Sequence, residues 1–546
     1  MQSVSSTFCE PGQLSYNEYE SAFSFLETSS FDPKSVDSFG TDGHKIKNLT
    51  TGFLNMLKSC NSEYAWNRSC CPRRRLTVPG KAYSNNGFDN KNGDLIVFVG
   101  DVFLSATGSQ YTVVDSLGSG TFGQVFKCKS NLTSKMYAVK VIKNKRAYFK
   151  QAKVEIEILK NLRVQKDYNA LRILEFFDFQ NHLFIVTDML GLNLYELIHF
   201  NHFCGYPLKT CSNIVKNILT TLSILEQNDI IHSDLKPENI LATNIHNLET
   251  NVTVIDFGSS CYGHKKIFSY LQSRFYRSPE IICGCSYSTK IDMWSLGCVA
   301  AELFLGLPIF PGVSEYNQIS RIVEMRGMPH ADMVIGAKNE KKYFKVDDSR
   351  ITRSRVVLRK SYCGYEYRAR RPGNPADNLA IKSESEWQVA NPPTPPSRRY
   401  FKYRYLPDTI HNYPILQLPE ETLRYTGRPN PHKADSEELE WIKYERAVFI
   451  DFLERCLRLK PEERASATEM LKHPFITGEP YLAPLYSTAE HEENMLWLCV
   501  QHNTSMKVRN ELISRTRATT ANADDERDRE ETPVTPEMRG KMIPCE

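Results

Sequence analysis

The residues best suited to chemistry lie in two short segments, HSDLKPEN at 232–239 and DFG at 256–258. Transfer of a phosphoryl group needs a carboxylate for the proton of the acceptor hydroxyl, a cation beside the moving group and oxygen ligands for Mg²⁺. The first segment supplies these groups in order, as Asp234, Lys236 and Asn239. Asp256 follows an apolar run and offers a second hard oxygen ligand. Together the two segments predict a site for magnesium-dependent phosphoryl transfer.

A glycine-rich run, LGSGTFGQV at 117–125, joins two segments in which apolar residues alternate. The pattern predicts a hairpin whose backbone N–H groups approach phosphate oxygens without side-chain obstruction. The same G-x-G-x-x-G spacing occurs in dinucleotide-binding folds, where a helix follows the last glycine directly. The alternating run at 124–129 argues against that fold, and a plain glycine hairpin is the alternative for this segment taken alone.

Lys140 ends the strand-like sequence YAVK, where its charge needs an acidic partner. Glu155 or Glu157 on the next predicted helix can supply that partner, and the spacing favours Glu155. Such an ion pair would aim the ammonium at the first two phosphates of a nucleotide. The alternative is that Lys140 extends to solvent from an edge strand.

The secondary structure expected around these residues changes along the chain. Four short β-prone runs flank one helical pattern at 147–162, which predicts a small strand-rich lobe. These runs are 111–117, 124–129, 136–142 and 183–187. Beyond residue 192, apolar residues recur every three or four positions in long segments, at 214–227, 292–305 and 436–459. We therefore expect an α+β fold with a small β-rich N-lobe and a large helical C-lobe.

Composition limits the classes of protein to consider. A chain of 546 residues, 41% of them hydrophobic, must bury a core, either as several domains or as one large two-lobed domain. The net charge of +4 predicts no dominant polyanionic partner, so we expect no direct nucleic-acid binding. The most apolar stretch, 296–310, contains Glu302 and Pro308, which argues against a membrane span.

Fifteen cysteines are scattered without zinc-finger spacing, although Cys283 and Cys285 enclose a single glycine. This usage predicts a reducing compartment, the cytoplasm, the nucleus or both. The first residues lack a basic region followed by an apolar run, so we expect no secretory signal.

Three segments lack a sustained hydrophobic period. The leader at 1–75 and the tail at 477–546 are expected to be largely disordered. A basic insertion at about 345–400, which includes NPPTPP, is expected to be extended and partly disordered. The insertion either binds acidic partners, acts with the basic run at 73–75 as a nuclear import signal, or is a solvated excursion.

Residues 111–476 resemble a eukaryotic protein kinase, and the lysine two places after Asp234 is the serine/threonine-kinase form of that loop. The sequences YLQSRFYRSPE at 270–280 and DMWSLGC at 292–298 resemble the dual-specificity tyrosine-regulated kinases, the DYRK family of the CMGC group. The sequences EYNQISRIVE at 315–324 and NGFDN at 86–90 are similar to the Yak subgroup in particular. The resemblance implies a bilobal domain, divided into an extension at 76–110, an N-lobe at 111–190 and a C-lobe at 191–476.

The resemblance also implies an activity and its site. The chain is expected to transfer the γ-phosphate of ATP, with Mg²⁺, to serine and threonine of protein substrates, as a monomer and with a preference for proline after the acceptor. The adenine is expected between Leu117, Val125, Ala138 and Leu241, with its edge on the backbone of Met189 and Leu190. The phosphates are expected under the loop residues Gly118, Ser119, Gly120, Thr121, Phe122, Gly123 and Gln124. A pseudokinase scaffold is the alternative, but it would lack a catalytic group and this sequence lacks none.

The resemblance assigns two further sets of residues. Tyr270 is expected to be autophosphorylated during maturation, and Arg274 and Arg277 have the charge to hold a phosphotyrosine. Glu280 is expected to form a buried structural ion pair with Arg464. The proline-flanked Thr394, Thr532 and Thr535 are candidate phosphorylation sites.

The sequence departs from the family pattern at three positions. Ser233 stands where most kinases have arginine and this family usually has cysteine, so the loop cannot bind an activation-loop phosphate there, and control should pass through Arg274 and Arg277. Phe268 replaces the first tyrosine of Tyr-x-Tyr, which leaves Tyr270 as the single candidate.

The third departure predicts inhibitor sensitivity. Thr187 stands before the 189–190 linker, where the family usually has phenylalanine, and the smaller side chain should open a larger back pocket. Bulky ATP-competitive inhibitors should therefore bind the wild type more tightly than Thr187→Phe, as measured by their inhibition constants. Equal constants for the two proteins would contradict the larger pocket.

Overall fold

The computed structural model describes Cys60 and residues 73–163, 171–243, 251–266, 271–346, 379–392, 399–412 and 436–480. The chain divides into two units, Met1–Arg74 and Arg75–Glu546, and the elements below belong to the second. Most of the predicted leader, the tail beyond residue 480 and the centre of the basic insertion lie outside the described residues.

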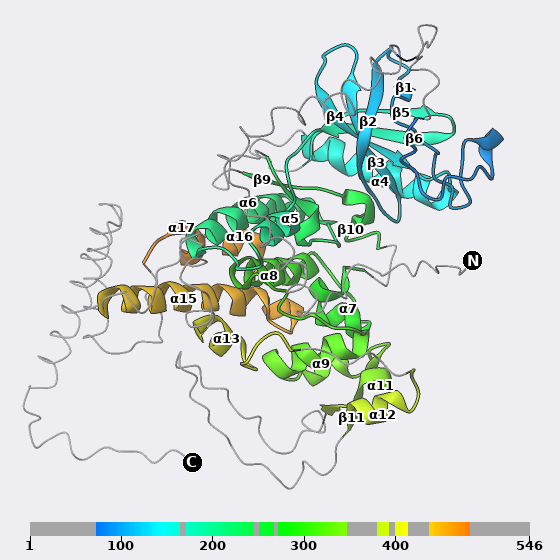
Figure 1. Cartoon of the computed structure of the whole chain (residues 1–546). Coiled ribbons are helices and arrows are strands. Elements are labelled where there is room, and N and C mark those ends of the chain that lie inside the picture. Colours follow the sequence, from blue (N-terminus) through cyan, green and yellow to red (C-terminus); the bar gives the residue numbers. More distant parts are fainter. Residues whose placement is uncertain are drawn as a thin grey trace, which may run out of the picture. The chain divides into compact units, whose positions relative to one another are not determined.

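A six-stranded antiparallel sheet, ordered β1-β2-β3-β4-β6-β5, forms the N-terminal part of this unit (Figure 1). Its strands are β1 Val102–Leu104, β2 Gln110–Ser119, β3 Gly123–Ser130, β4 Met136–Ile142, β5 Ile173–Phe179 and β6 His182–Asp188. Helix α4, Arg146–Arg163, packs against β4, β5 and β6. All four predicted β-runs and the predicted helix are confirmed, whereas β1 and β5 were not predicted.

The segment before residue 111 is part of the sheet's core. Phe103 on β1 faces Tyr111 on β2 in the strand register, and its ring lies edge-on to Phe184, with 4.8 Å between the ring centroids. Leu95 and Val97 are buried in the same cluster. Because these apolar side chains leave water together with those of the sheet, the extension stabilises the N-lobe.

The rest of the unit is mainly helical, which confirms the predicted α+β architecture. Its helices are α5 Leu194–Phe200, α6 Leu208–Gln227, α7 Pro279–Cys283, α8 Lys290–Leu305, α9 Glu315–Arg326, α10 Ala331–Val334, α11 Glu340–Tyr343, α12 Glu384–Gln388, α13 Leu406–Asn412, α15 Ser436–Cys456, α16 Ala467–Met470 and α17 Pro474–Thr477. Short strands also occur, at β7 Ile230–Ile231, β8 Ile240–Ala242, β9 Val252–Val254, β10 Cys261–Tyr262, β11 Phe344–Val346 and β12 Leu379–Ile381. Single 3₁₀ turns are η3 Asn85–Gly87, η4 Pro237–Asn239, η5 Phe257–Ser259, η6 Arg274–Tyr276 and η9 Pro461–Glu463.

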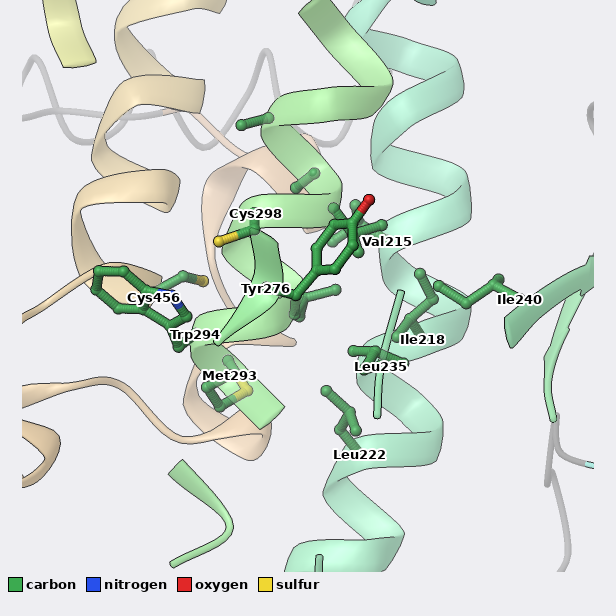
Figure 2. Close-up of a cluster of buried hydrophobic side chains, with 14 of the residues drawn as sticks. Val215, Ile218, Leu222, Leu235, Ile240, Tyr276, Met293, Trp294, Cys298 and Cys456 are labelled. Atoms are coloured by element: carbon green, nitrogen blue, oxygen red, sulfur yellow. The ribbon is translucent and has the colours of Figure 1, made fainter. Parts of the chain in front are cut away.

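Helix α8 lies in the centre of the helical part, between α6 and α15 (Figure 2). Every residue from 291 to 305 is buried, because the helix is apolar on nearly all sides. Its neighbours contribute Val215, Ile218 and Leu222 from α6 and Cys456 from α15. In the part of the chain that the structure describes, no helix combines the length and hydrophobicity that crossing a membrane requires.

The two ends of the basic insertion are ordered. β11 pairs antiparallel with β12, so that Phe344 faces Ile381. Trp387 on α12 then stacks on Tyr316 of α9, with 4.9 Å between the ring centroids. The expectation of an extended chain is therefore wrong at 379–388, where a strand partner and an aromatic contact are available.

The predicted ion pair between Glu280 and Arg464 is confirmed. The guanidinium donates to both carboxylate oxygens, at 2.6 and 3.0 Å, and neither side chain is exposed to solvent. It also donates to the Lys290 carbonyl and lies over the ring of Trp294. Removing one partner would leave a buried charge without compensation, at a cost of about 3–5 kcal/mol.

Glu302 is a carboxyl group buried in α8. The Tyr276 hydroxyl donates a hydrogen bond to it at 2.7 Å. Burial raises the pKa of Glu302 to about 8, although that hydrogen bond opposes the shift. Between its ordinary pKa near 4.5 and about 8, the folded protein therefore holds a proton that the unfolded chain releases.

This difference predicts a pH-dependent stability. Because the folded state binds the extra proton, the contribution of Glu302 to the free energy of unfolding falls as pH rises, by at most ~1.4 kcal/mol per pH unit. Glu302→Gln cannot titrate, so its stability relative to the wild type should increase between about pH 5 and pH 8. Urea unfolding of both proteins across this range measures the difference. A constant difference would contradict the buried, protonated carboxyl.

Candidate active site

One ammonium joins the sheet, helix α4 and the loop at residue 256. Lys140 Nζ on β4 donates to both carboxylate oxygens of Glu155, at 2.7 and 3.0 Å, and to Asp256 Oδ1 at 2.9 Å. The predicted choice of Glu155 over Glu157 is confirmed, since Glu157 is exposed and accepts from the Tyr262 hydroxyl instead. The alternative of a solvent-exposed Lys140 is wrong, because its side chain is only 16% exposed.

The charges of these groups depend on one another. Burial acts to lower the pKa of Lys140, but the carboxylates of Asp256 and Glu155 outweigh it and raise that pKa. Burial disfavours the Asp256 carboxylate, yet the ammonium lowers its pKa to about 2. Burial raises the pKa of Glu155 although Lys140 opposes the shift, and the negative charge of Asp256 raises it further. Lys140 and Asp256 are thus both charged at neutral pH.

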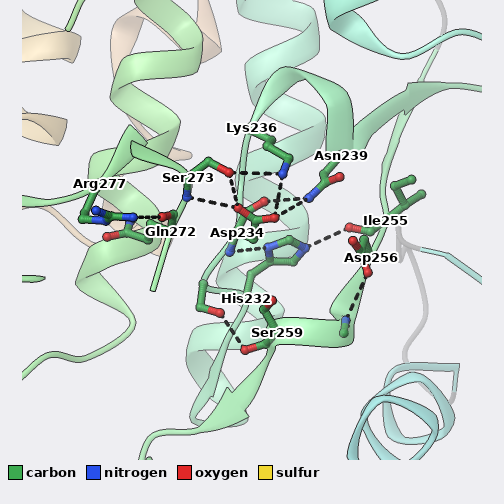
Figure 3. Close-up of polar contacts among 12 residues, drawn as sticks. His232, Asp234, Lys236, Asn239, Ile255, Asp256, Ser259, Gln272, Ser273 and Arg277 are labelled. Carbon is green, nitrogen blue, oxygen red and sulfur yellow. Dashed lines mark hydrogen bonds and ion pairs between the residues drawn. The ribbon is translucent and has the colours of Figure 1, made fainter. Parts of the chain in front are cut away.

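A second group of polar side chains surrounds Asp234 (Figure 3). Lys236 Nζ donates to Asp234 Oδ2 at 2.8 Å, and Asn239 Nδ2 donates to the same oxygen at 3.2 Å. The hydroxyl of Ser273 donates to Asp234 Oδ1 at 2.8 Å and accepts from Lys236 at 3.1 Å. The carboxylate is therefore fixed on both oxygens. Burial acts to lower the pKa of Lys236, but Asp234 outweighs it and raises that pKa.

Buried groups hold the backbone of this loop. Asp292 on α8 accepts from the backbone N–H groups of His232 and Ser233, at 2.7 and 2.9 Å. Ser233 has φ 67° and Asp256 has φ 60°, both in the left-handed region that costs a non-glycine residue energy. The Ser233 hydroxyl donates to the Ser259 carbonyl at 2.7 Å. Strained backbone on both sides of the site is thus kept in place by hydrogen bonds from buried neighbours.

The glycine-rich run forms the predicted hairpin, because β2 pairs with β3 across it. Its glycines have different physical roles. A Cβ at Gly118 or Gly120 would meet no atom within 4 Å, so their bare backbone borders open space, whereas one at Gly123 would collide with the Val141 carbonyl oxygen at 2.1 Å. The first two glycines thus suit the approach of a ligand, and the third is needed for packing.

One residue of the predicted phosphate loop uses its side chain for a contact elsewhere. Gln124 is buried and donates to the Leu95 carbonyl at 3.0 Å, so its side chain is used in anchoring the N-terminal extension. Ser119 and Thr121 are exposed. The Phe122 ring lies beside Gly258, because a Cβ at Gly258 would come within 3.2 Å of it.

The predicted adenine residues lie on strands β2, β3, β4 and β8 and on the linker that follows β6. Ala138 on β4 faces Thr187 on β6. Leu241 on β8 forms an isolated β-bridge with Asn193, which follows the linker. The other members of the predicted set are Leu117 on β2, Val125 on β3 and the linker residues Met189 and Leu190. Leu117 is 44% exposed and the rest are half-buried, so each keeps surface that a ligand can contact.

The arginines predicted to hold a phosphotyrosine differ in their contacts. Arg277 is 3% exposed and donates to the carbonyls of Leu271 and Gln272, at 2.8 and 2.7 Å. Arg274 donates to the Val313 carbonyl at 2.8 Å. Tyr270 and Phe268 lie outside the described residues, so the phosphotyrosine clamp stays a prediction.

Comparison with known proteins identifies the family. The protein kinase domain family matches residues 111–476. The probable serine/threonine-protein kinase yakA of Dictyostelium discoideum is 40% identical over 83% of this chain and 30% of its own length. The serine/threonine-protein kinase ppk15 of Schizosaccharomyces pombe is 38% identical over 83% of this chain and 78% of its own length. The human dual specificity tyrosine-phosphorylation-regulated kinase 4 is 41% identical over 50% of this chain and 52% of its own length.

The chain belongs to the protein kinases, in the DYRK family and of the Yak type. Of these three relatives it spans less than a third, just over three quarters and about half of the length. Family membership implies the use of ATP and protein substrates. The individual catalytic, nucleotide-binding and metal-binding assignments stay predictions, although the structure brings the charged groups among them together.

Two contributors to the kinase site were not predicted. Ser273 contacts Asp234 from 39 positions away in the sequence, and nothing in its local pattern indicates chemistry. Asp292 was part of a quoted motif, but its anchoring role depends on a contact between α8 and the loop at His232. The available signal was an acid at the start of an apolar helix.

The ion pair between Lys140 and Glu155 predicts that substitutions of Glu155 and Glu157 affect kinase activity differently. Glu155→Gln keeps the side-chain shape but removes the charge that orients Lys140, so kcat/KM for ATP should fall by about tenfold or more, ~1.4 kcal/mol of transition-state stabilisation. Glu157→Gln, two positions away on the same helix, should leave kcat/KM near the wild-type value. Steady-state assays with matched melting curves measure both. An equal effect of the two substitutions would contradict the assigned partner.

Proposed function

We propose that the protein catalyses transfer of the ATP γ-phosphate to serine and threonine residues of protein substrates. The observation that carries this proposal is the convergence of two charged groups of residues. Lys140, Glu155 and Asp256 form one, and Asp234 with Lys236 forms the other. A site that positions charge around a transferring phosphoryl group needs both groups.

Asp234 fits the role of the residue that receives or orients the acceptor proton. Its carboxylate is held in one orientation by Lys236, Asn239 and Ser273, so it does not have to reorganise when the hydroxyl arrives. Lys236 is 22% exposed, which allows its ammonium to reach the moving phosphoryl group as well. Lys140 is oriented by Glu155 to contact the other phosphates.

The residues present fit a Mg²⁺ ion. The amide nitrogen of Asn239 is engaged with Asp234, which leaves its carbonyl oxygen as the donor for a cation. The Asp256 side chain is 38% exposed and charged at neutral pH. Both are hard oxygen donors of the kind that Mg²⁺ prefers. When bound, the ion neutralises charge on the phosphate oxygens, and Asn239 and Asp256 are the residues that would hold it.

We further propose dual specificity, with autophosphorylation of Tyr270 and then activity on serine and threonine. Support comes from the human relative, whose name includes dual specificity and tyrosine-phosphorylation regulation. Arg277 also donates hydrogen bonds to the carbonyls of Leu271 and Gln272, the two residues that directly follow Tyr270. A phosphate at Tyr270 would therefore lie close in sequence to a segment already joined, through Ser273, to Asp234. A preference for proline after the acceptor remains part of this proposal.

Expression in a bacterial host tests the activity and the subgroup together. The recombinant full chain should carry phosphate on Tyr270 when its peptides are analysed by mass spectrometry, because autophosphorylation needs no other enzyme. Lys140→Arg should lack this phosphate. Asp234→Asn should lower turnover of a serine peptide by about a hundredfold or more. Phosphate on Tyr270 in Lys140→Arg, or full turnover by Asp234→Asn, would sink the proposal.

A further inference from the structure

Two cysteines form a close pair at the end of helix α7, outside the phosphoryl-transfer site. Cys283 is the last residue of the helix and Cys285 follows after Gly284, which has φ 78°. The N–H of Cys285 turns back to the Glu280 carbonyl at 2.9 Å. Consecutive Cα atoms are ~3.8 Å apart, so residues two apart in such a turn fall in the ~4.4–6.8 Å range that a disulfide spans.

The turn that carries this pair is held firmly from outside. A side chain at Gly284 would collide with Lys338 Cβ at 2.9 Å, and its φ is one that other residues rarely adopt. Asn339 donates its backbone N–H to the Cys283 carbonyl and its side-chain amide to the Ile282 carbonyl, both at 2.9 Å. The packing therefore restricts the ways in which the two thiols can separate.

The two thiols have different environments. Cys283 is fully buried, whereas Cys285 is half-buried and donates to the Met333 carbonyl at 3.1 Å. The Cys283 thiol beside it lowers the pKa of Cys285, while Cys285 and burial raise the pKa of Cys283. Because the thiolate is the reactive form, Cys285 is the nucleophile that a small oxidant can reach.

We propose that Cys283 and Cys285 are a modification site, a dithiol that peroxides oxidise to an intrachain disulfide. The Cys285 thiolate attacks one oxygen of hydrogen peroxide, the O–O bond breaks, and a sulfenic acid and hydroxide form. The Cys283 sulfur then attacks the Cys285 sulfur and expels hydroxide, which leaves as water with the Cys283 proton. In total, two thiols and one peroxide give one disulfide and two waters, and the two electrons come from the sulfurs.

Oxidation at this place reaches the phosphoryl-transfer site through helix α7. The disulfide removes the Cys285 donor from the Met333 carbonyl and tightens the turn at the end of the helix. At the other end of α7, the N–H of Ser278 donates to Gln272 Oε1 at 2.9 Å. Gln272 directly precedes Ser273, which contacts Asp234. Resting on the proposed kinase activity, we therefore expect the disulfide to lower phosphoryl transfer.

The sequence makes the pair convenient to assay. Trypsin should release residues 278–290, SPEIICGCSYSTK, which contain both cysteines and no third one. After hydrogen peroxide treatment of the reduced full chain and alkylation, this peptide should appear unalkylated and lighter by two hydrogen atoms. Dithiothreitol should return it to the doubly alkylated form. A doubly alkylated peptide after peroxide, or one bearing only sulfinic or sulfonic acid, would overturn the proposal.

Activity measurements with matched variants test the consequence. Peroxide should remove most of the wild-type kinase activity, and dithiothreitol should restore it. Cys285→Ser and Cys283→Ala should each resist this loss, whereas Cys60→Ser, which changes an exposed cysteine elsewhere, should behave as the wild type. Equal loss in Cys285→Ser would overturn the regulatory role. The mass measurement requires no kinase activity, so failure of the disulfide and failure of the proposed function remain distinguishable.

Discussion

The position of one partly buried ammonium constrains the rest of the structure. Lys140 is 15 residues from Glu155 and 116 residues from Asp256 in the sequence, yet it bonds to both. A charge of this kind is costly to bury without partners, so β4, α4 and the loop at Asp256 must approach one another correctly at once. The same requirement leaves Asp256 charged and partly exposed, which is the state that a metal ligand needs.

Buried contacts in the helical part hold the second charged group, Asp234 and Lys236, in position relative to the first. Asp292 fixes the loop that carries Asp234 to α8, a helix with almost no exposed residue. The ion pair of Glu280 and Arg464 fixes α7 to the end of the turn η9. Ser278, just before α7, is hydrogen-bonded to Gln272. Ser273 completes the connection by its bond to Asp234. The contacts that stabilise the helical part therefore also position the site, and the proposed disulfide at Cys283 and Cys285 would act through them.

Much of this arrangement follows from local sequence pattern, and the remainder depends on contacts between distant residues. The strands at 111–142 and helix α4 were predicted because their hydrophobic periods are regular, and the partner of Lys140 was predicted because helix geometry separates Glu155 from Glu157. Strand β1 has three residues, too few for a period, and β5 carries Glu175 and Asp178 among its aromatic residues. The role of Ser273, and the use of Gln124 to anchor the extension, appear only after folding.

Nucleotide binding without turnover tests the central role of Lys140 most directly. Isothermal titration of ADP and of adenosine into the wild type and Lys140→Met separates contacts to phosphate from contacts to the nucleoside. The account predicts that Lys140→Met weakens ADP binding by about tenfold or more, ~1.4 kcal/mol, while adenosine binding is unchanged. Equal losses for ADP and adenosine, or no loss for ADP, would contradict an ammonium positioned for phosphate.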